Sequence, residues 1–164
     1  MDRDRAAQLV KDIRVAFADV ERGAGTTLSE ARAMDDYRSP EDQKKARQLD
    51  TDVRWWEIPK TKIEKLYDAF TFLDAEGMRY YIAPFLIYDL ENPDSDLPVG
   101  DSVVGQLERT DIADSFAIFD SKQSAVIARY LQARAEDSET DPVIAKEATK
   151  ALRRYWGSFL PETS

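Results

Sequence analysis

The side chains best suited to chemistry lie in one short stretch near the middle of this chain. An arginine binds carboxylates and phosphates, a phenol donates or accepts a hydrogen bond, and a carboxylate accepts a proton. A proline at position 84 would break the backbone hydrogen bonding of a helix there and open space for a ligand. The residues that would line such a ligand pocket are Arg79, Tyr80, Tyr81 and Asp74. The competing interpretation is structural, with Arg79 in an ion pair to Asp74 or Asp89.

Two residue types central to catalysis are missing, because the sequence contains neither histidine nor cysteine. This removes the commonest general base, the serine–histidine and cysteine–histidine nucleophiles, and zinc sites built from these residues. There is no P-loop, and Gly23 and Gly25 lack the third glycine and the preceding strand of a dinucleotide-binding motif. The sequence favours a protein that is not an enzyme, with no catalytic residue, no metal and no cofactor.

A second candidate site is a run of acidic residues that follows the central apolar segment. Between residues 80 and 121 the sequence has nine acidic residues and one basic residue, Arg109, so this sector carries −8 of the net charge of −9. Such a sector either binds a basic partner or consists of solvated loops and helix caps. The predicted partner-binding residues are Asp89, Glu91, Asp94, Asp96 and Asp101, with Trp55 as an aromatic contact.

The leading hypothesis from these patterns is an interaction protein whose acidic face meets a basic protein, for example a toxin neutralised by an immunity protein. Nucleic acid is disfavoured because phosphate contacts need basic surface, and an anionic membrane is disfavoured by the net charge. A homodimer built on an exposed tryptophan, Trp55 or Trp156, is a third possibility. The alternative from another class is a small-molecule or metal-dependent enzyme with carboxylate and arginine groups near Pro84.

Helices must position these residues, because every clear apolar pattern has helical spacing and strand patterns are nearly absent. The sequence predicts an all-α fold: one compact domain over residues 1–164, with roughly seven or eight helices around a buried, proline-kinked segment at 70–90. Asp74 is suited to cap a helix that begins at Ala75. Pro84 then leaves two options: one kinked helix, or a short helix over 75–81 that restarts near Ala83. The segment is too short to span a membrane.

Local capping patterns predict where the other helices begin and end. A first helix over 3–21 should stop at Gly23 and Gly25, and Gly157 should cap the last one. The helix that begins after Ser39 should turn Ala46 and Leu49 inward. Residues 112–119 fit either an extended link or a helical turn. The predicted helix starts are Thr27, Ser39, Thr61, Asp74, Asp101, Asp120 and Pro142.

The start of the sequence, MDRDRAAQLV, does not resemble a signal peptide, and the absence of cysteine excludes disulfides. We therefore expect a cytoplasmic protein.

Four short motifs are similar to those of a known family. They are W-E-I-P at Trp56–Pro59, F-L-D-x-E-G-x-R-Y-Y-I-A-P-F at Phe72–Phe85, F-x-x-F-D-x-x-Q at Phe116–Gln123 and A-L-x-x-Y-W at Ala151–Trp156. As a set they resemble a family of small bacterial proteins known only as a domain of unknown function, over about Thr27 to Trp156. The resemblance implies a bacterial intracellular protein and brings no catalytic residue with it.

Overall fold

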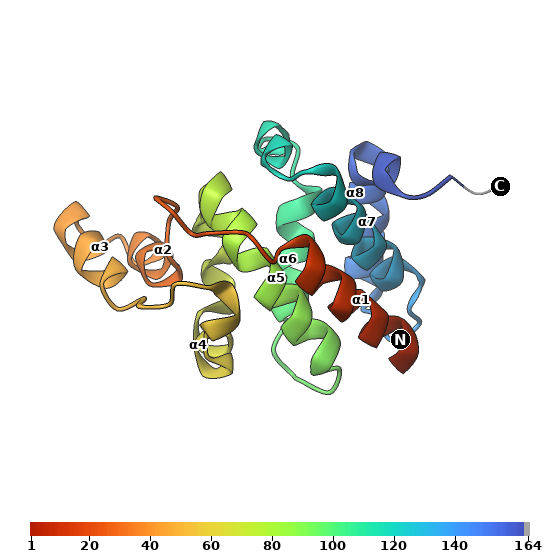
Figure 1. The fold of residues 1–164 in the computed structure, drawn as a ribbon, viewed down its shortest axis with the longest axis horizontal. Coiled ribbons are helices and arrows are strands. Elements are labelled where there is room, and N and C mark those ends of the chain that lie inside the picture. Colours follow the sequence, from red (N-terminus) through yellow and green to blue (C-terminus); the bar gives the residue numbers. More distant parts are fainter. Residues whose placement is uncertain (163–164) are drawn as a thin grey trace. The chain divides into compact units, whose positions relative to one another are not determined.

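The computed structural model describes residues 1–162, and over that range the chain forms helices and turns without a β-strand. The all-α prediction is confirmed. Eight α-helices are joined by loops and by four short 3₁₀ helices (Figure 1). The α-helices are α1 (Arg3–Ala16), α2 (Leu28–Asp35), α3 (Pro40–Arg47), α4 (Lys60–Leu66), α5 (Ala75–Glu91), α6 (Val99–Glu108), α7 (Ser121–Glu136) and α8 (Pro142–Arg154). None of the described helices is long and apolar enough to cross a membrane.

The chain divides into two compact units. Unit 1 comprises Met1–Ala18 and the chain from Val104 onward, and unit 2 comprises Asp19–Val103. The boundary falls inside α6. A single domain over residues 1–164 stays a prediction.

Unit 1 is built on α7, which packs against both α1 and α8. The 3₁₀ helix Trp156–Phe159 closes it with a cluster of aromatic rings, and the Trp156 indole donates a hydrogen bond to the Leu107 carbonyl at 3.1 Å. Trp156 is completely buried. The sequence-based suggestion of a dimer contact at Trp156 is therefore wrong, because this side chain belongs to the core of its own unit.

Helix α5 is the central element of unit 2, and it runs through Pro84 without interruption. Of the two options predicted for this segment, the single helix is correct. Twelve of its 17 residues are buried, which confirms a buried central helix. Within the unit α5 packs against two 3₁₀ helices, Trp55–Glu57 and Tyr67–Phe72, and the Phe70 and Phe85 rings lie 5.0 Å apart.

Four predicted helix boundaries differ from the structure. Helix α6 begins at Val99, so Asp101 lies inside its first turn and does not start the helix. Helix α1 ends at Ala16 and not at residue 21, because Phe17 and Val20 leave the helix to enter the core. Helix α4 begins after Pro59 without a side-chain cap, so Thr61 is not its cap. Gly157 lies within the last 3₁₀ helix, whereas α8 is capped at Tyr155.

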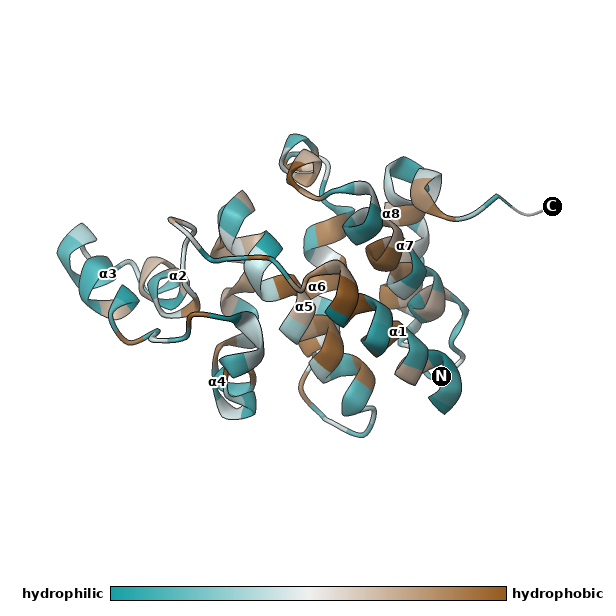
Figure 2. Cartoon of the chain, viewed as in Figure 1, coloured by the Kyte–Doolittle hydropathy of each residue, from teal (hydrophilic) through white to brown (hydrophobic). Residues whose placement is uncertain are grey.

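Helix α3 is the least covered element of unit 2. None of its residues is buried, and Figure 2 shows it in largely hydrophilic colours. The prediction that Ala46 and Leu49 point into the core is wrong: Ala46 is partly exposed, and Leu49, just beyond the helix, is 69% exposed. The apolar side of α3 therefore has no complete cover from the residues that the structure describes.

The turn between α2 and α3 holds an aromatic residue in a strained conformation. Tyr37 has a φ of 57°, a left-handed backbone in which glycine is usual. The amides of Tyr37 and Arg38 donate to the carbonyls of Met34 and Ala33 at 3.0 and 2.9 Å, which is the Schellman pattern that ends a helix. The Tyr37 side chain is 96% exposed, so packing does not offset the strain.

Replacing Tyr37 with glycine should therefore stabilise the protein. Relief of the left-handed strain is worth about 1–2 kcal/mol, from which the greater freedom of glycine in the unfolded chain removes about 0.5–1 kcal/mol. We expect the free energy of unfolding to rise by about 0.5–1 kcal/mol, measured by urea denaturation. A fall in this free energy would show that the tyrosine side chain itself stabilises the turn.

Candidate functional site

At the position of the predicted pocket a buried hydrogen-bond network surrounds Tyr80, whereas the buried Tyr81 hydroxyl has no hydrogen bond within residues 1–162. Tyr80 is fully buried and Tyr81 is 1% exposed. The Tyr80 hydroxyl donates to Oδ2 of Asp52 at 2.5 Å, and Arg22 Nη1 lies 3.4 Å from the same oxygen. Arg22 also donates to the Asp50 carbonyl at 3.1 Å. This network ties α5 to the segment that leads into the Trp55–Glu57 turn.

The environment of both tyrosines favours their neutral form. Burial, with the hydrogen bond to Asp52, raises the pKa of Tyr80 above its ordinary value. Burial, with the nearby charges of Asp50 and Asp52, raises the pKa of Tyr81. A phenol must lose its proton to act as a base or a strong nucleophile, so neither hydroxyl does so at neutral pH.

Asp74 holds backbone rather than a ligand. Its Oδ1 accepts hydrogen bonds from the Gly77 amide at 2.8 Å and from the Thr26 amide at 3.0 Å. The first bond caps α5 as predicted, and the second fixes the loop before α2 against the same helix end. The two segments lie so close that a Cβ atom on Gly25 would be 2.7 Å from the Gly77 nitrogen. Arg79 is partly exposed, and its buried Nε has no hydrogen bond within residues 1–162.

Of the acidic residues that the sequence predicts to bind a partner, only two line the same hollow. Glu91 and Asp94 line a hollow of about 340 Å³ together with Glu64 of α4, which the sequence did not predict. The Tyr88 hydroxyl donates to Glu64 at 2.9 Å, and Lys60, the one cation in the lining, donates to Asn92 at 2.7 Å. Asp96 is exposed but outside this lining, and Asp89 and Asp101 are only partly exposed.

The tryptophan pair is arranged in the opposite way to the prediction. Trp55 is 3% exposed and packs in the core, whereas Trp56 is 52% exposed. Adjacent residues of a tight turn point in different directions, so only one of the two indoles can be buried. Trp55 is therefore not a surface contact, and Trp56, next to the Arg54 guanidinium at 6.0 Å, takes that place.

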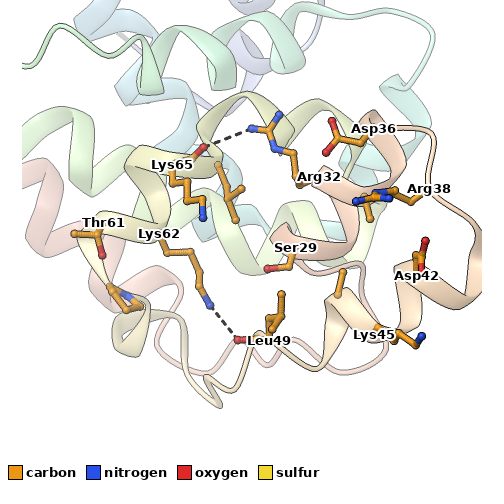
Figure 3. Close-up of a pocket in the computed structure, with 14 residues that line it drawn as sticks. Ser29, Arg32, Asp36, Arg38, Asp42, Lys45, Leu49, Thr61, Lys62 and Lys65 are labelled. Atoms are coloured by element: carbon orange, nitrogen blue, oxygen red, sulfur yellow. Dashed lines mark hydrogen bonds between the residues drawn. The ribbon is translucent and has the colours of Figure 1, made fainter.

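Unit 2 also contains a groove that the sequence did not predict. It has a volume of about 740 Å³ and lies among α2, α3 and α4 (Figure 3). Its apolar part consists of Ala33, Ala46, Leu49, Pro59 and Leu66. Its charged part consists of the basic residues Arg32, Arg38, Lys45, Lys62 and Lys65 and the acidic residues Asp36 and Asp42. Basic side chains thus outnumber acidic ones in a protein whose net charge is −9.

A buried carboxylate fixes one wall of the groove. Asp50 accepts hydrogen bonds from the Ser29 amide and hydroxyl at 2.9 Å each and from Lys62 Nζ at 2.8 Å. Its side chain is inaccessible to solvent. Burial alone would raise the pKa of Asp50, but hydrogen bonds from Lys62, Thr27 and Ser29 outweigh it and hold the pKa below its usual value. A carboxylate with a lowered pKa is a poor base, and the hydrogen bonds of Asp50 join α2 to α4.

A sequence signal for the groove existed at residues with helical spacing on α2 and α3. Ser29, Arg32, Ala33 and Asp36 recur at i, i+3, i+4 and i+7, and so do Asp42, Lys45, Ala46 and Leu49. Small residues at the centre with charged residues beside them are unusual for a face that packs in a core. The pattern pointed to two half-exposed faces turned toward the same space.

The motifs and the fold can now be compared with known proteins. A family model, described as a family of unknown function (DUF6714), matches residues 5–159. The chain belongs to this family. The DUF6714 match confirms the resemblance seen in the sequence, and the matched region covers nearly the whole chain. No curated protein and no solved structure matches it.

Substitution of Asp50 by asparagine should destabilise the protein strongly. It leaves the Lys62 ammonium without its carboxylate partner in a mostly buried position, a loss that costs about 3–5 kcal/mol in comparable buried pairs. The check is urea denaturation of wild type and Asp50→Asn at neutral pH. Asp94→Asn, an exposed aspartate, is the matched control and should change the free energy of unfolding by less than about 0.5 kcal/mol. If both substitutions changed the free energy of unfolding by the same small amount, Asp50 would not be the main contact between α2 and α4.

Lowering the pH should reduce the difference in free energy of unfolding between wild type and Asp50→Asn. The folded state holds the pKa of Asp50 below that of the unfolded chain, so its contribution is complete above about pH 4 and is lost as the pH falls further. Between pH 5 and pH 2.5, wild type should therefore lose more stability than Asp50→Asn, which has no carboxylate to protonate. A constant difference across this interval would contradict the lowered pKa.

Proposed function

We propose that this protein is a non-enzymatic interaction protein that presents an acidic surface to a basic segment of a protein partner. One observation carries the proposal. Asp94 and Asp96 are exposed, and neither forms an ion pair in the part of the chain that the structure describes. Glu91 is exposed beside them, and Glu64 faces the same hollow as Glu91 and Asp94. We call Glu64, Glu91, Asp94 and Asp96 the acidic surface.

Charges of this kind act on a partner rather than on the fold. Exposed carboxylates such as Asp94 and Asp96, which form no ion pair within residues 1–162, add little to stability, and like charges close together slightly oppose it. They attract a basic partner over about a Debye length, roughly 8 Å at physiological salt, and so raise the rate of encounter. A binding function explains why such an arrangement is present in a fold that does not need it.

The titratable groups support binding over catalysis. A general acid or base works best when its pKa lies near the working pH. The buried groups of unit 2 are shifted the other way, with raised pKa values at Tyr80 and Tyr81 and a lowered one at Asp50. Each is therefore held in one protonation state at neutral pH. Neither of the two hollows described above is lined by Arg79, Tyr80 or Tyr81, so neither supports the alternative of an enzyme pocket near Pro84.

A narrower version of the proposal is a bacterial cytoplasmic protein that neutralises a basic toxin, as an immunity protein does. The lack of cysteine supports a reducing compartment, and an acidic surface suits inhibition of a basic protein.

The test is to reverse the charge of the acidic surface. Purified wild type and the double variant Asp94→Lys, Asp96→Lys are used as bait in cell lysate at low and high salt, and bound proteins are identified by mass spectrometry. We expect a basic partner that wild type retains at low salt and that the variant loses, with at least about a tenfold fall in affinity when the isolated pair is measured.

The control variant separates position from total charge. Asp19→Lys with Glu139→Lys reverses two exposed acids outside residues 89–120 and changes the net charge by the same amount. It should retain the partner. Equal loss in both variants would mean that only overall charge matters, and retention in both would remove the acidic surface as a binding site.

A further inference from the structure

We propose that the groove among α2, α3 and α4 is a second binding site, which accepts an acidic amphipathic segment of a protein partner. This site is independent of the acidic surface and has the opposite charge preference. Its argument rests on the uncovered helix faces, the charges at the rim and the strained, exposed Tyr37.

The groove has the form of a helix-binding cleft. Two faces, Ser29–Asp36 on α2 and Asp42–Leu49 at α3, each extend over two helical turns, or about 10 Å. Small side chains, Ser29, Ala33 and Ala46, lie along these faces and let a backbone approach closely. Leu49 in the lining is a large apolar side chain that remains in solvent, and Tyr37, which adjoins two lining residues in sequence but is not itself in the lining, is also exposed. A small-molecule site would enclose such groups, whereas a partner segment laid along the groove would cover them.

The charged residues at the rim of the groove favour an acidic occupant. Arg32 and Lys62 are held by carboxylates, Arg32 by Asp35 and Asp68 and Lys62 by Asp50. In contrast, Arg38, Lys45 and Lys65 have no side-chain hydrogen bond or ion pair within residues 1–162. Asp36 and Asp42 lie at the same end as Arg38 and Lys45, so that end is mixed in charge, whereas Lys62 and Lys65 at the other end have no acid next to them in the lining (Figure 3). Lys45 and Lys65 are therefore the cations available to an occupant.

The charge of the groove lining is opposite to that of unit 2 as a whole. Unit 2 contains 19 acidic and 11 basic residues, yet the groove is lined by five basic and two acidic ones. Concentrating cations around apolar surface in an otherwise acidic unit fits carboxylates carried on an apolar segment. A nucleic acid would instead need a broad basic surface to neutralise successive phosphates.

Tyr37 gives an independent reason to expect a partner here. Its left-handed backbone is strained, and its 96% exposed ring makes up for none of that strain within the chain. Tyr37 is not itself a lining residue, but both of its neighbours in sequence, Asp36 and Arg38, line the groove. Tyrosine is enriched among the residues that dominate binding energy, because it offers a large rigid surface with a polar end. We assign Tyr37 as an aromatic anchor for the bound segment.

The experiment is selection of peptides from a displayed random library of about 12 residues, the length of a three-turn helix. The full chain is the target, and the selected peptides are then measured individually by fluorescence anisotropy. Enriched peptides should combine aspartate or glutamate with apolar residues at three- and four-residue spacing. Lys45→Glu with Lys65→Glu should weaken them by at least about tenfold.

Two further variants make the result specific. Lys122→Glu with Lys146→Glu reverses two exposed lysines of unit 1 and should leave peptide affinity within about twofold. Tyr37→Gly should weaken binding by about tenfold. Because the same substitution relieves backbone strain, its thermal midpoint should be equal to or higher than that of wild type, so loss of binding cannot be attributed to unfolding.

Several outcomes would overturn the proposal. They are enrichment of basic or uncharged peptides, no enrichment at all, or acidic peptides that bind the Lys45/Lys65 variant as well as wild type. Dodecanoate and an RNA of about 20 nucleotides are tested in parallel. If either binds in a manner that depends on Lys45 and Lys65 while no acidic peptide is enriched, the groove is a site for that ligand and not for a protein segment.

Discussion

Unit 2 depends on one buried carboxylate. A charge removed from water must be neutralised and fully hydrogen-bonded, or its burial costs several kcal/mol. Asp50 meets this demand by accepting from Ser29 at the start of α2 and from Lys62 in the middle of α4. These bonds specify where the two helices lie relative to each other. Because α3 lies between them in sequence and packs on α2, the same constraint leaves the space that forms the groove.

A second polar network extends this arrangement to the central helix. Arg22 reaches both Asp52 and the carbonyl of Asp50, and Tyr80 of α5 donates to Asp52. Asp74 joins the loop at Thr26 to the first turn of α5. Tyr80 and Asp74, two of the groups that the sequence offers for chemistry, are thus occupied in holding segments together. This is why the polar residues of the central stretch explain the fold, whereas the exposed charges outside it are the better candidates for function.

The correct predictions concern contacts between residues that are close in sequence. The missed features depend on contacts between residues that are distant in sequence. A cap needs only a side chain and the backbone three residues away, so capping was readable. The correct starts were those at Thr27, Ser39, Asp74, Asp120 and Pro142. By contrast, α1 ends early because Phe17 and Val20 are drawn into the core, which no local pattern shows. The same holds for Trp55 and Trp56, whose order of burial depends on the direction in which the turn enters the core. Asp50 lies 21 residues from Ser29, so their contact could not be read from spacing.

The two proposed surfaces differ in how a partner would find them. A basic segment approaching unit 2 meets a favourable field at long range, because the unit contains 19 acidic and 11 basic residues. Its association should therefore be fast and strongly weakened by salt. An acidic segment meets the same field as repulsion and gains attraction only within reach of Lys45 and Lys65. Such a segment must rely on apolar contacts with Leu49 and Tyr37, so its binding should be slower to form and less sensitive to salt. Added salt screens the unfavourable field as well as the local pairs, and the two effects partly cancel. If both proposals hold, the same net charge would speed the association of the basic segment and slow that of the acidic one, so a single acidic unit would discriminate between the two.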